Sequence, residues 1–351
     1  MFLKKRKLIG LDIGSRYIKV VQLNDARAGY ELALFDFVPI PTDVVNDGLI
    51  IDRDQLAAGI RELLKKVGLK TADAVLGVSG HSSVIIKRIT LPLMTEDELS
   101  GSMRYEAEQY IPFDINDVSL DFQILGQKKG DEGQMDVVLV AVKRNVINDY
   151  VDVVRQTGLE PVVVDVDSFA LSNMYEINYS PSDARNVALV NVGASITNIN
   201  ILQDGVPVFT RDSAIGSNHH NEALEKTLNL SKEDSEKAKR GYTVEGITAE
   251  DAQAVVNHSS HDIFAEIYRS FEYFRSSVSD EEIDKIILSG GAAMIGEFGS
   301  LMGERIGIPV EIANPFRRIE IPARMNAEFV RDMAPIAAVA VGLALRREGD
   351  R

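Results

Sequence analysis

The sequence predicts an α/β fold in which two related domains face each other across a cleft. Strand-like runs alternate with helical runs along most of the 351 residues, as in α/β proteins. A strand–turn–strand pattern at residues 8–20 returns at residues 186–201, and each half also has a strand that ends on Ser-Gly, at 79–80 and at 289–290. An internal duplication accounts for both repeats, and two domains fit the length.

Composition excludes several classes of function. The formal net charge of −15, from 53 acidic and 38 basic residues, repels phosphate backbones and disfavours nucleic-acid binding. The absence of cysteine excludes disulfides, cysteine nucleophiles and thiolate metal sites. The 5 histidines have no carboxylates at zinc-ligand spacing, and we expect them at surface or cap positions. No P-loop pattern is present.

Hydrophobic segments that could enter a membrane are not expected. The basic stretch at residues 1–7 is expected to be a solvated terminus, because the apolar core of a signal peptide does not follow it. The apolar stretch at residues 334–345 contains Pro335 and is too short to span a bilayer. We therefore expect a cytoplasmic protein that reaches the membrane only through partners.

The first domain is expected to open with two adjacent strands, at residues 9–13 and 17–23. A helix at about 54–67 should end at Gly68, because glycine is the residue most typical of helix C-termini. A buried strand should follow at 74–78.

The character of the sequence changes at residue 91. Thr95 and Glu98 form a capping box, which opens a helix expected to run to about Tyr110 and to stop at Ile111-Pro112. The other elements expected before a linker at 180–183 are strands at 118–125, 137–142 and 162–166 and helices at 146–157 and from Ser168.

Two tight turns are expected to meet at the mouth of the cleft. In the aligned repeats Asn191 takes the place of Asp12, and Gly193 takes the place of Gly14. An isolated Asp-x-Gly is most often a capped hairpin, but two such turns in matching positions can offer backbone N–H groups to a polyphosphate from both sides. Asp12 would then face a phosphate-bound Mg2+ through water, and Lys19 would neutralise phosphate charge.

A third glycine motif, Ser-Gly-Gly-Ala at 289–292, is expected to open a helix in the second half. Gly-Gly before a helix is usually only a tight turn. Placed after the two hairpins, it is expected to lie on the nucleoside side of the site, where Gly290 and Gly291 let a flat ligand approach the backbone.

The motifs, and the order in which they follow one another, resemble those of the actin/Hsp70/sugar-kinase superfamily over nearly the whole chain. They stand at 11–15 (phosphate-1), 164–171 (connect-1), 191–195 (phosphate-2), 288–292 (adenosine) and about 333–343 (connect-2). The resemblance implies a duplicated actin-like, ribonuclease H-like ATPase fold that binds ATP and Mg2+.

The resemblance also implies roles for single residues. Asp12 would hold the hydration shell of Mg2+, and Asp167 would position the attacking water weakly. Glu236 and Lys239 would contact ribose and purine, although their spacing alone fits a solvated helix face. The residues implied to bind the nucleotide are Gly14, Ser15, Lys19, Asn191, Gly193, Ala194, Ser195, Gly216, Glu236, Lys239, Gly290, Gly291 and Ala292.

One departure from strongly hydrolysing relatives bears on catalysis. Their phosphate-2 motif begins with aspartate, and here that position is Asn191. An amide can bond a metal-bound water but brings no negative charge, and Asp167 has a shorter side chain than the Gln or Glu used elsewhere. General-base help is typically worth ~10²–10⁴-fold in rate. We therefore predict nucleotide binding with slow or negligible hydrolysis.

Four stretches narrow the resemblance to the FtsA-like PilM family of type IV pilus assembly proteins: 103–113, 118–121, 159–167 and 313–316. Members bind ATP and hold the cytoplasmic N-terminal tail of PilN in a groove between two subdomains of the first half. The resemblance implies an FtsA-type inserted subdomain at about 91–143, and it leaves contacts with pilus motor ATPases and homo-oligomer formation open. The implied partner-binding residues are Met103, Ile111, Pro112 and Phe113, although core packing also explains the apolar face of this helix.

The expected domains are residues 1–180 and 181–351, the second with a nested subdomain at about 216–282. The expected function is an ATP-binding scaffold of the pilus inner-membrane complex, peripheral at the inner membrane. One alternative is a sugar-type kinase, but no carboxylate that could deprotonate an acceptor lies between His81 and Glu96. Another is a filament former, although residues 346–351 lack the membrane-targeting helix of FtsA.

Overall fold

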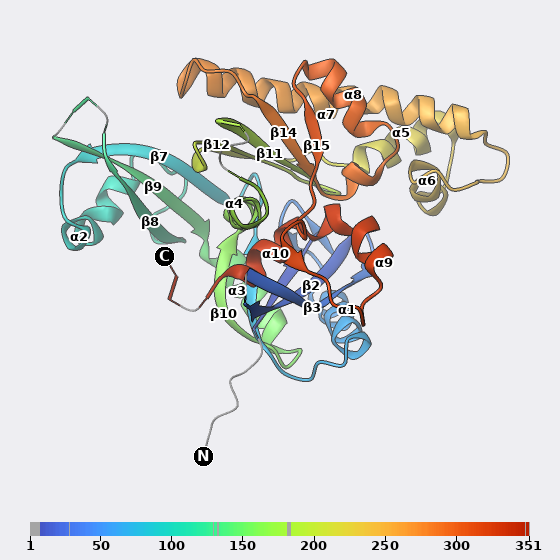
Figure 1. The fold of residues 1–351 in the computed structure, drawn as a ribbon, viewed down its shortest axis with the longest axis horizontal. Coiled ribbons are helices and arrows are strands. Elements are labelled where there is room, and N and C mark those ends of the chain that lie inside the picture. The colour runs from blue at the N-terminus through green and yellow to red at the C-terminus, as the bar shows by residue number, and fades with distance from the viewer. Residues whose placement is uncertain are drawn as a thin grey trace.

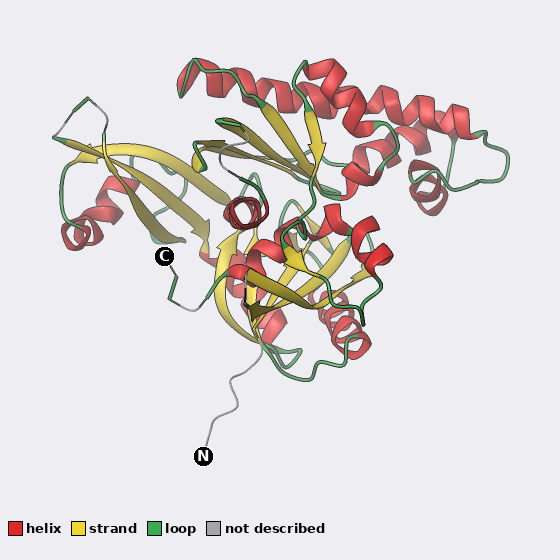
Figure 2. Ribbon diagram, in the orientation of Figure 1, coloured by secondary structure: helices red, strands yellow, loops and turns green. Residues whose placement is uncertain are grey.

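The computed structural model describes residues 8–27, 29–128, 130–131, 133–180, 184–347 and 349–350. The basic stretch at 1–7 and residues 181–183 of the expected linker lie outside these residues. Two sheets lie one above the other, with helices on their outer faces, and a smaller three-stranded unit extends to one side (Figures 1 and 2).

The first domain is built on a six-stranded sheet whose order is β10-β6-β1-β2-β3-β16. β1 pairs antiparallel with β2 and parallel with β6, so the predicted adjacent strands are confirmed. The predicted helix α1 is also confirmed, and Gly68 after it has φ +70°, a conformation that favours glycine. The elements are β1 (Leu8–Ile13), β2 (Tyr17–Ala26), β3 (Gly29–Pro39), β4 (Val45–Asn46), β5 (Leu49–Ile50), α1 (Arg53–Lys66), β6 (Asp73–Val78), α3 (Arg144–Arg155) and β10 (Glu160–Val166).

The inserted subdomain has its own sheet, in the order β7-β9-β8, and its own apolar core. Both halves of the predicted capping box form, since the Thr95 side chain accepts from the Glu98 N–H and the Glu98 side chain accepts from the Thr95 N–H. The subdomain begins before residue 91, because β7 pairs with β9 along its whole length. Its elements are β7 (Val84–Pro92), α2 (Glu96–Ala107), β8 (Val118–Gln127) and β9 (Gln134–Lys143).

The second domain repeats the strand pairing of the first. β11 pairs antiparallel with β12 and parallel with β14, just as β1 pairs with β2 and β6. The nested region at 216–282 contains α5, α6 and α7, which pack on one another. The elements are β11 (Asn186–Val192), β12 (Thr197–Gln203), β13 (Val206–Ser213), α5 (Asn218–Leu228), α6 (Lys232–Lys239), α7 (Ala249–Ser277), β14 (Lys285–Ser289), η2 (Gly291–Met294), α8 (Phe298–Ile306) and β15 (Val310–Ile312).

The end of the chain returns to the first domain. β16 (Ile319–Glu320) pairs with β3, and after α9 (Ala327–Asp332) and η3 (Ala334–Ala337) the helix α10 (Ala338–Leu345) packs on β1 and β2. The last segment, which the expected division at residue 180 assigns to the second domain, therefore packs on the first domain as well, and its apolar residues share one core with residues of both sheets.

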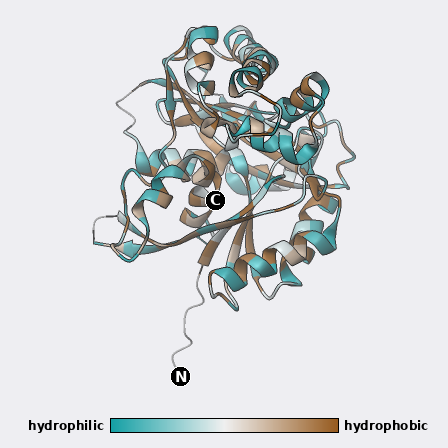
Figure 3. Ribbon diagram, turned by 90° about the vertical axis from the view of Figure 1, so that its right-hand side faces the viewer, coloured by the Kyte–Doolittle hydropathy of each residue, from teal (hydrophilic) through white to brown (hydrophobic). Residues whose placement is uncertain are grey.

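Helices α4 (Asp167–Asn178) and α10 cross closely between the two sheets. A Cβ on Gly342 of α10 would lie 1.8 Å from the Ala170 carbonyl oxygen of α4, so only glycine fits at this crossing. Hydrophobic residues gather along the central strands and the inward sides of the helices, with hydrophilic residues on the outer helix surfaces (Figure 3). Among the described residues, no helix has both the length and the apolar character needed to cross a membrane.

Candidate functional site

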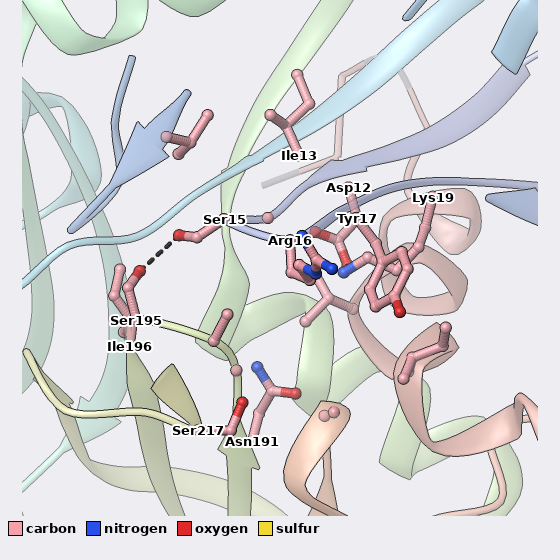
Figure 4. Close-up of a pocket in the computed structure, with 18 of the residues that line it drawn as sticks. Asp12, Ile13, Ser15, Arg16, Tyr17, Lys19, Asn191, Ser195, Ile196 and Ser217 are labelled. Carbon is pink, nitrogen blue, oxygen red and sulfur yellow. Dashed lines mark hydrogen bonds and ion pairs between the residues drawn. The ribbon is translucent and has the colours of Figure 1, made fainter. Parts of the chain in front are cut away.

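A cavity of about 290 Å³ lies between the two domains, at the lower end of the range for ligand pockets. It is lined by both hairpin turns (Figure 4). The start of α4, the end of α6 and the loop after β14 also line it. The predicted site residues that line it are Asp12, Gly14, Ser15, Lys19, Asp167, Asn191, Gly193, Ala194, Ser195, Glu236, Lys239, Gly290 and Gly291. Gly216 and Ala292 do not line it, and both are buried behind it.

The two hairpin turns face each other across this cavity. Ser15 Oγ of the first turn and Ser195 Oγ of the second are 2.5 Å apart (Figure 4). The N–H groups of Ser15, Arg16, Ala194 and Ser195 have no acceptor among the described residues. Gly216 supports the second turn, since a Cβ there would lie 2.6 Å from the Ala194 carbonyl oxygen. The turns therefore offer free donors to an anion from both sides.

Asp12 and Lys19 form a nearly buried ion pair at the bottom of the cavity. They lie opposite each other on β1 and β2, and Lys19 Nζ donates to Asp12 Oδ2 at 2.6 Å. Asp167 adds a second carboxylate from the first residue of α4. Gly77 leaves room for it, because a Cβ at that position would lie 2.3 Å from Asp167 Oδ1. The carboxyl groups of Asp12 and Asp167 thus both line the cavity.

The environment of Asp167 favours its protonated form. Burial first, and the negative charge of Asp12 second, raise its pKa to about 7, although a hydrogen bond from Ser79 acts in the opposite direction. Because this pKa is above that of an exposed aspartate, the folded chain binds the proton more tightly than the unfolded chain does. Ionisation of Asp167 therefore costs stability as the pH rises from about 4 to above 7.

We expect Asp167→Asn to raise the melting temperature of the ligand-free protein, with a larger gain near pH 8 than near pH 5, because the amide carries no charge to bury. Thermal denaturation in a chelator at both pH values measures this. Asp136→Asn is the matched control, because hydrogen bonds from Arg88 and Thr90 overcome burial and lower the pKa of Asp136. That variant should lose stability near pH 8, and an Asp167→Asn gain that did not depend on pH would contradict the assignment.

Glu236 and Lys239 form the opposite end of the cavity. Their side chains are nearly buried, and Lys239 Nζ donates to Glu236 Oε2 at 2.7 Å. Asn221 donates to the same carboxylate oxygen at 3.0 Å. Burial lowers the pKa of Lys239, and the Glu236 carboxylate opposes that shift. The alternative of a solvated helix face is therefore wrong for this pair.

The third glycine motif is held close to the second hairpin. Gly290 has φ +89°, and a Cβ there would lie 2.4 Å from the Val192 carbonyl oxygen. The expected helix after it is the short 3-10 helix η2.

Sequence reasoning missed two further residues that line the cavity, Arg240 and Tyr242, which follow α6. The Arg240 guanidinium lies 5.2 Å from the centre of the exposed Tyr242 ring, and both residues line the cavity.

Asn191 is fixed by its neighbours rather than free to rotate. Its amide nitrogen donates to Asn198 Oδ1 at 2.9 Å, and its Oδ1 accepts from Ser289 Oγ at 3.2 Å. Both asparagines line the cavity. No group of three or more histidine or acidic residues that could hold a metal ion occurs in the part of the chain that the structure describes.

Two of the expected partner-binding side chains are buried. Met103 and Ile111 are 3% and 7% exposed and belong to the core of the inserted subdomain. The Ile111 N–H donates to the Ala107 carbonyl at 3.2 Å, so the backbone donor of this residue is also paired within the chain. Pro112 is exposed, and Phe113 is half-buried with Lys143 Nζ 4.5 Å from its ring centre.

One histidine also departs from the expected surface positions. His220 is fully buried, with Nδ1 2.9 Å from Ser259 Oγ, and burial lowers its pKa to about 3. His219 lies nearer the surface, with Nε2 2.8 Å from Asp262 Oδ2. His220 therefore packs as a neutral core residue.

Known structures share this architecture. A structure of a "PilM-PilN type IV pilus biogenesis complex" matches with a TM-score of 0.85 and 28% identity over 97% of this chain and 98% of that chain. The ethanolamine utilization protein EutJ from Carboxydothermus hydrogenoformans matches with a TM-score of 0.58 and 17% identity over 98% and 90% of the two chains. MreB5 of Spiroplasma citri bound to AMPPNP matches with a TM-score of 0.51 and 14% identity over 97% and 95%.

The last two similarities concern the fold, which is the actin-like ATPase fold that the motifs predicted. The family model described as "Type IV pilus assembly protein PilM" matches residues 10–348. The chain therefore belongs to the PilM family of type IV pilus assembly proteins.

Proposed function

We propose that this protein is an ATP-binding scaffold of the type IV pilus inner-membrane complex, and that it holds the cytoplasmic N-terminal tail of PilN. The observation that carries the proposal is the 28% identity to the PilM–PilN complex structure over 97% of the chain, together with the cavity between the domains. The protein would work in the cytoplasm, at the inner membrane through PilN, and would couple PilN to the pilus motor.

The residues that line the cavity fit a nucleoside triphosphate with Mg2+. The free N–H groups of the two hairpin turns would hold the phosphates, as in other anion nests. Asp12 would hold the Mg2+ hydration shell, and the cation would screen phosphate charge. Lys19 would then exchange its pairing with Asp12 for a phosphate oxygen, and Glu236 and Lys239 would contact the nucleoside.

Hydrolysis is expected to be slow, because Asn191 is neutral and held by Asn198 and Ser289. Asp167 is a poor base when it carries a proton, and its raised pKa favours that state near neutral pH. Binding of a fluorescent ATP analogue and release of inorganic phosphate, measured on the same preparation, test this. Binding with turnover far below that of a metabolic kinase is the expected result, and turnover at the rate of such a kinase would contradict it.

We place the groove for the PilN tail between two strand edges that pair with no further strand in the described part of the chain. One edge is β10, the outermost strand of the six-stranded sheet, whose valines at 162–164 are half-buried. The other is β8, the outermost strand of the sheet of the inserted subdomain. Burial, and to a smaller extent the negative charge of Asp121 on β8, raise the pKa of Asp165 on β10, whereas Arg346 lowers it, so the two carboxyl groups lie within range of each other's charge. An extended peptide can bind such an edge through its main chain.

Phe113 stands where the inserted subdomain joins the first domain, beside Lys143 at the end of β9. We expect Phe113→Ala to weaken binding of a PilN-tail peptide by about tenfold, since buried aromatic contacts dominate interfaces. Calorimetric titration measures this, with a melting curve to confirm folding. Tyr105→Ala, at an aromatic residue of α2 that is 72% exposed, is the control and should bind like the wild type. Equal affinities for the two variants would exclude this junction from the binding site.

A further inference from the structure

A continuous line of hydrogen bonds leaves the cavity on the side of the second domain. Ser289 Oγ donates to Asn191 Oδ1 at 3.2 Å, and Asn191 Nδ2 donates to Asn198 Oδ1 at 2.9 Å. Asn198 Nδ2 then donates to Asp212 Oδ1 at 2.8 Å. Asn191 and Asn198 are part of the cavity wall, whereas Asp212 is not. These hydrogen bonds therefore connect the cavity to Asp212 on β13.

The line of hydrogen bonds ends at residues 80–83, which lead from β6 into β7 of the inserted subdomain. The Gly80 N–H donates to the second carboxylate oxygen of Asp212 at 2.9 Å, and the His81 ring lies 3.2 Å from the Asp212 carbonyl oxygen. The Gly80 carbonyl in turn accepts from the N–H of Val84, the first residue of β7. Each carboxylate oxygen of Asp212 therefore accepts one hydrogen bond. Oδ1 accepts from Asn198, which lines the cavity, and Oδ2 accepts from Gly80, which leads into the inserted subdomain.

Residues 80–83 form hydrogen bonds to both domains. On the side of the first domain, Asp47 accepts from the His81 N–H at 3.0 Å and from Ser82 Oγ at 2.8 Å. The exit of the subdomain is tied to the same place, because the Lys143 N–H donates to the Ser83 carbonyl. The inserted subdomain is connected to the rest of the chain through residues 80–83 and through Lys143. If Asp212 moved relative to Asp47, both connections would shift and the orientation of the subdomain would change.

We propose that Asp212 is the positioning residue that couples occupancy of the cleft to the orientation of the inserted subdomain, and hence to the PilN groove. This rests on the proposed function. A ligand that moves Asn191 or Asn198 moves the acceptor of the Gly80 N–H, and the subdomain carries β8, one wall of the groove. Coupling of two sites is reciprocal, so the PilN tail should also change the affinity for the nucleotide by the same factor.

Asp212→Asn is the sharpest test because it keeps the shape and removes one acceptor. Asn198 and Gly80 both donate to Asp212, so an amide can satisfy only one of them. We would measure the affinity of the full chain for a PilN-tail peptide by calorimetry, with and without saturating Mg-ATP. The wild type should show a ratio of about 5–150 between the two affinities, and the variant a ratio near one.

Two further variants separate coupling from folding. Asn198→Ala interrupts the line without touching Gly80 and should also bring the ratio near one. Asp136→Asn, which loses an acceptor shared by Arg88 and Thr90 within the inserted subdomain, should keep the wild-type ratio. A wild-type ratio in both Asp212→Asn and Asn198→Ala would overturn the inference, as would loss of the ratio in Asp136→Asn.

A second readout does not depend on PilN. Mg-ATP should change hydrogen exchange of the amides at 80–84 in the wild type but not in Asp212→Asn. If the wild type binds ATP without a change there, the inference fails while the proposed function stands. If the wild type binds no peptide but shows the exchange change, the PilN assignment fails and the coupling stands.

Discussion

Replacing Gly342 with alanine is expected to lower the free energy of unfolding by about 3 kcal/mol. The new Cβ would lie 1.8 Å from the Ala170 carbonyl oxygen, so α10 would have to move away from α4. Both helices pack between the two sheets, and the strain would reach the core shared by α10, β1 and β2. A fall of about 5 °C or more in the thermal midpoint is the corresponding result.

Gly101→Ala is the matched control for this substitution. Gly101 lies inside α2, and a Cβ there has open space within 4 Å. Alanine restricts the unfolded chain more than glycine does, so stability should rise by roughly 0.5–1 kcal/mol. If the two variants melted at the same temperature, the close crossing of α4 and α10 would be contradicted.

Asp12→Asn is expected to lower the affinity for Mg-ATP at least about tenfold, because the amide removes the negative charge that would hold the hydrated cation. Lys19 would lose its partner at 2.6 Å and become free to contact phosphate directly. In a chelator, ATP should therefore bind the variant at least as well as the wild type. Titration with a fluorescent ATP analogue, with Mg2+ and with a chelator, measures both effects.

Asn191→Asp makes the opposite change at the equivalent position of the second hairpin. A carboxylate there should strengthen the dependence of ATP binding on Mg2+. Unchanged Mg-ATP affinity in Asp12→Asn would exclude Asp12 from the metal site, whatever the second variant shows.

The two hairpins could be predicted because a local pattern specifies them. Each copy carries an apolar strand, a glycine turn and a second strand, and the pairing of Asp12 with Lys19 recurs in the pairing of Asn191 with Asn198. The capping box at Thr95 is equally local. In such cases the residues that interact are near neighbours in the sequence, so spacing alone reports the contact.

The contacts between the domains could not be predicted, because they join residues far apart in sequence. Neither the return of β16 to β3 nor the bond between Asp212 and Gly80 leaves a periodic signal. Spacing alone also could not assign Glu236 and Lys239 to the site, because a charged pair three residues apart fits a solvated helix face equally well. The resemblance assigned them to the site, and the packing of α6 beside the cavity takes them out of solvent.

The partner-binding stretch allowed two interpretations for a related reason. An apolar helix face followed by Ile-Pro-Phe fits both a docking surface and a core, and the inserted subdomain is small enough to need Met103 and Ile111 for its own core. The neighbouring Phe113 remains only half-buried, which is why the binding experiment rests on it.

The most direct test of the account is a calorimetric titration of the full chain with a peptide of the PilN cytoplasmic tail, in the presence and absence of Mg-ATP. Saturable binding with an affinity that changes when Mg-ATP is present is the predicted result. It would show that groove and cleft belong to one scaffold. The absence of binding in both conditions would contradict the account.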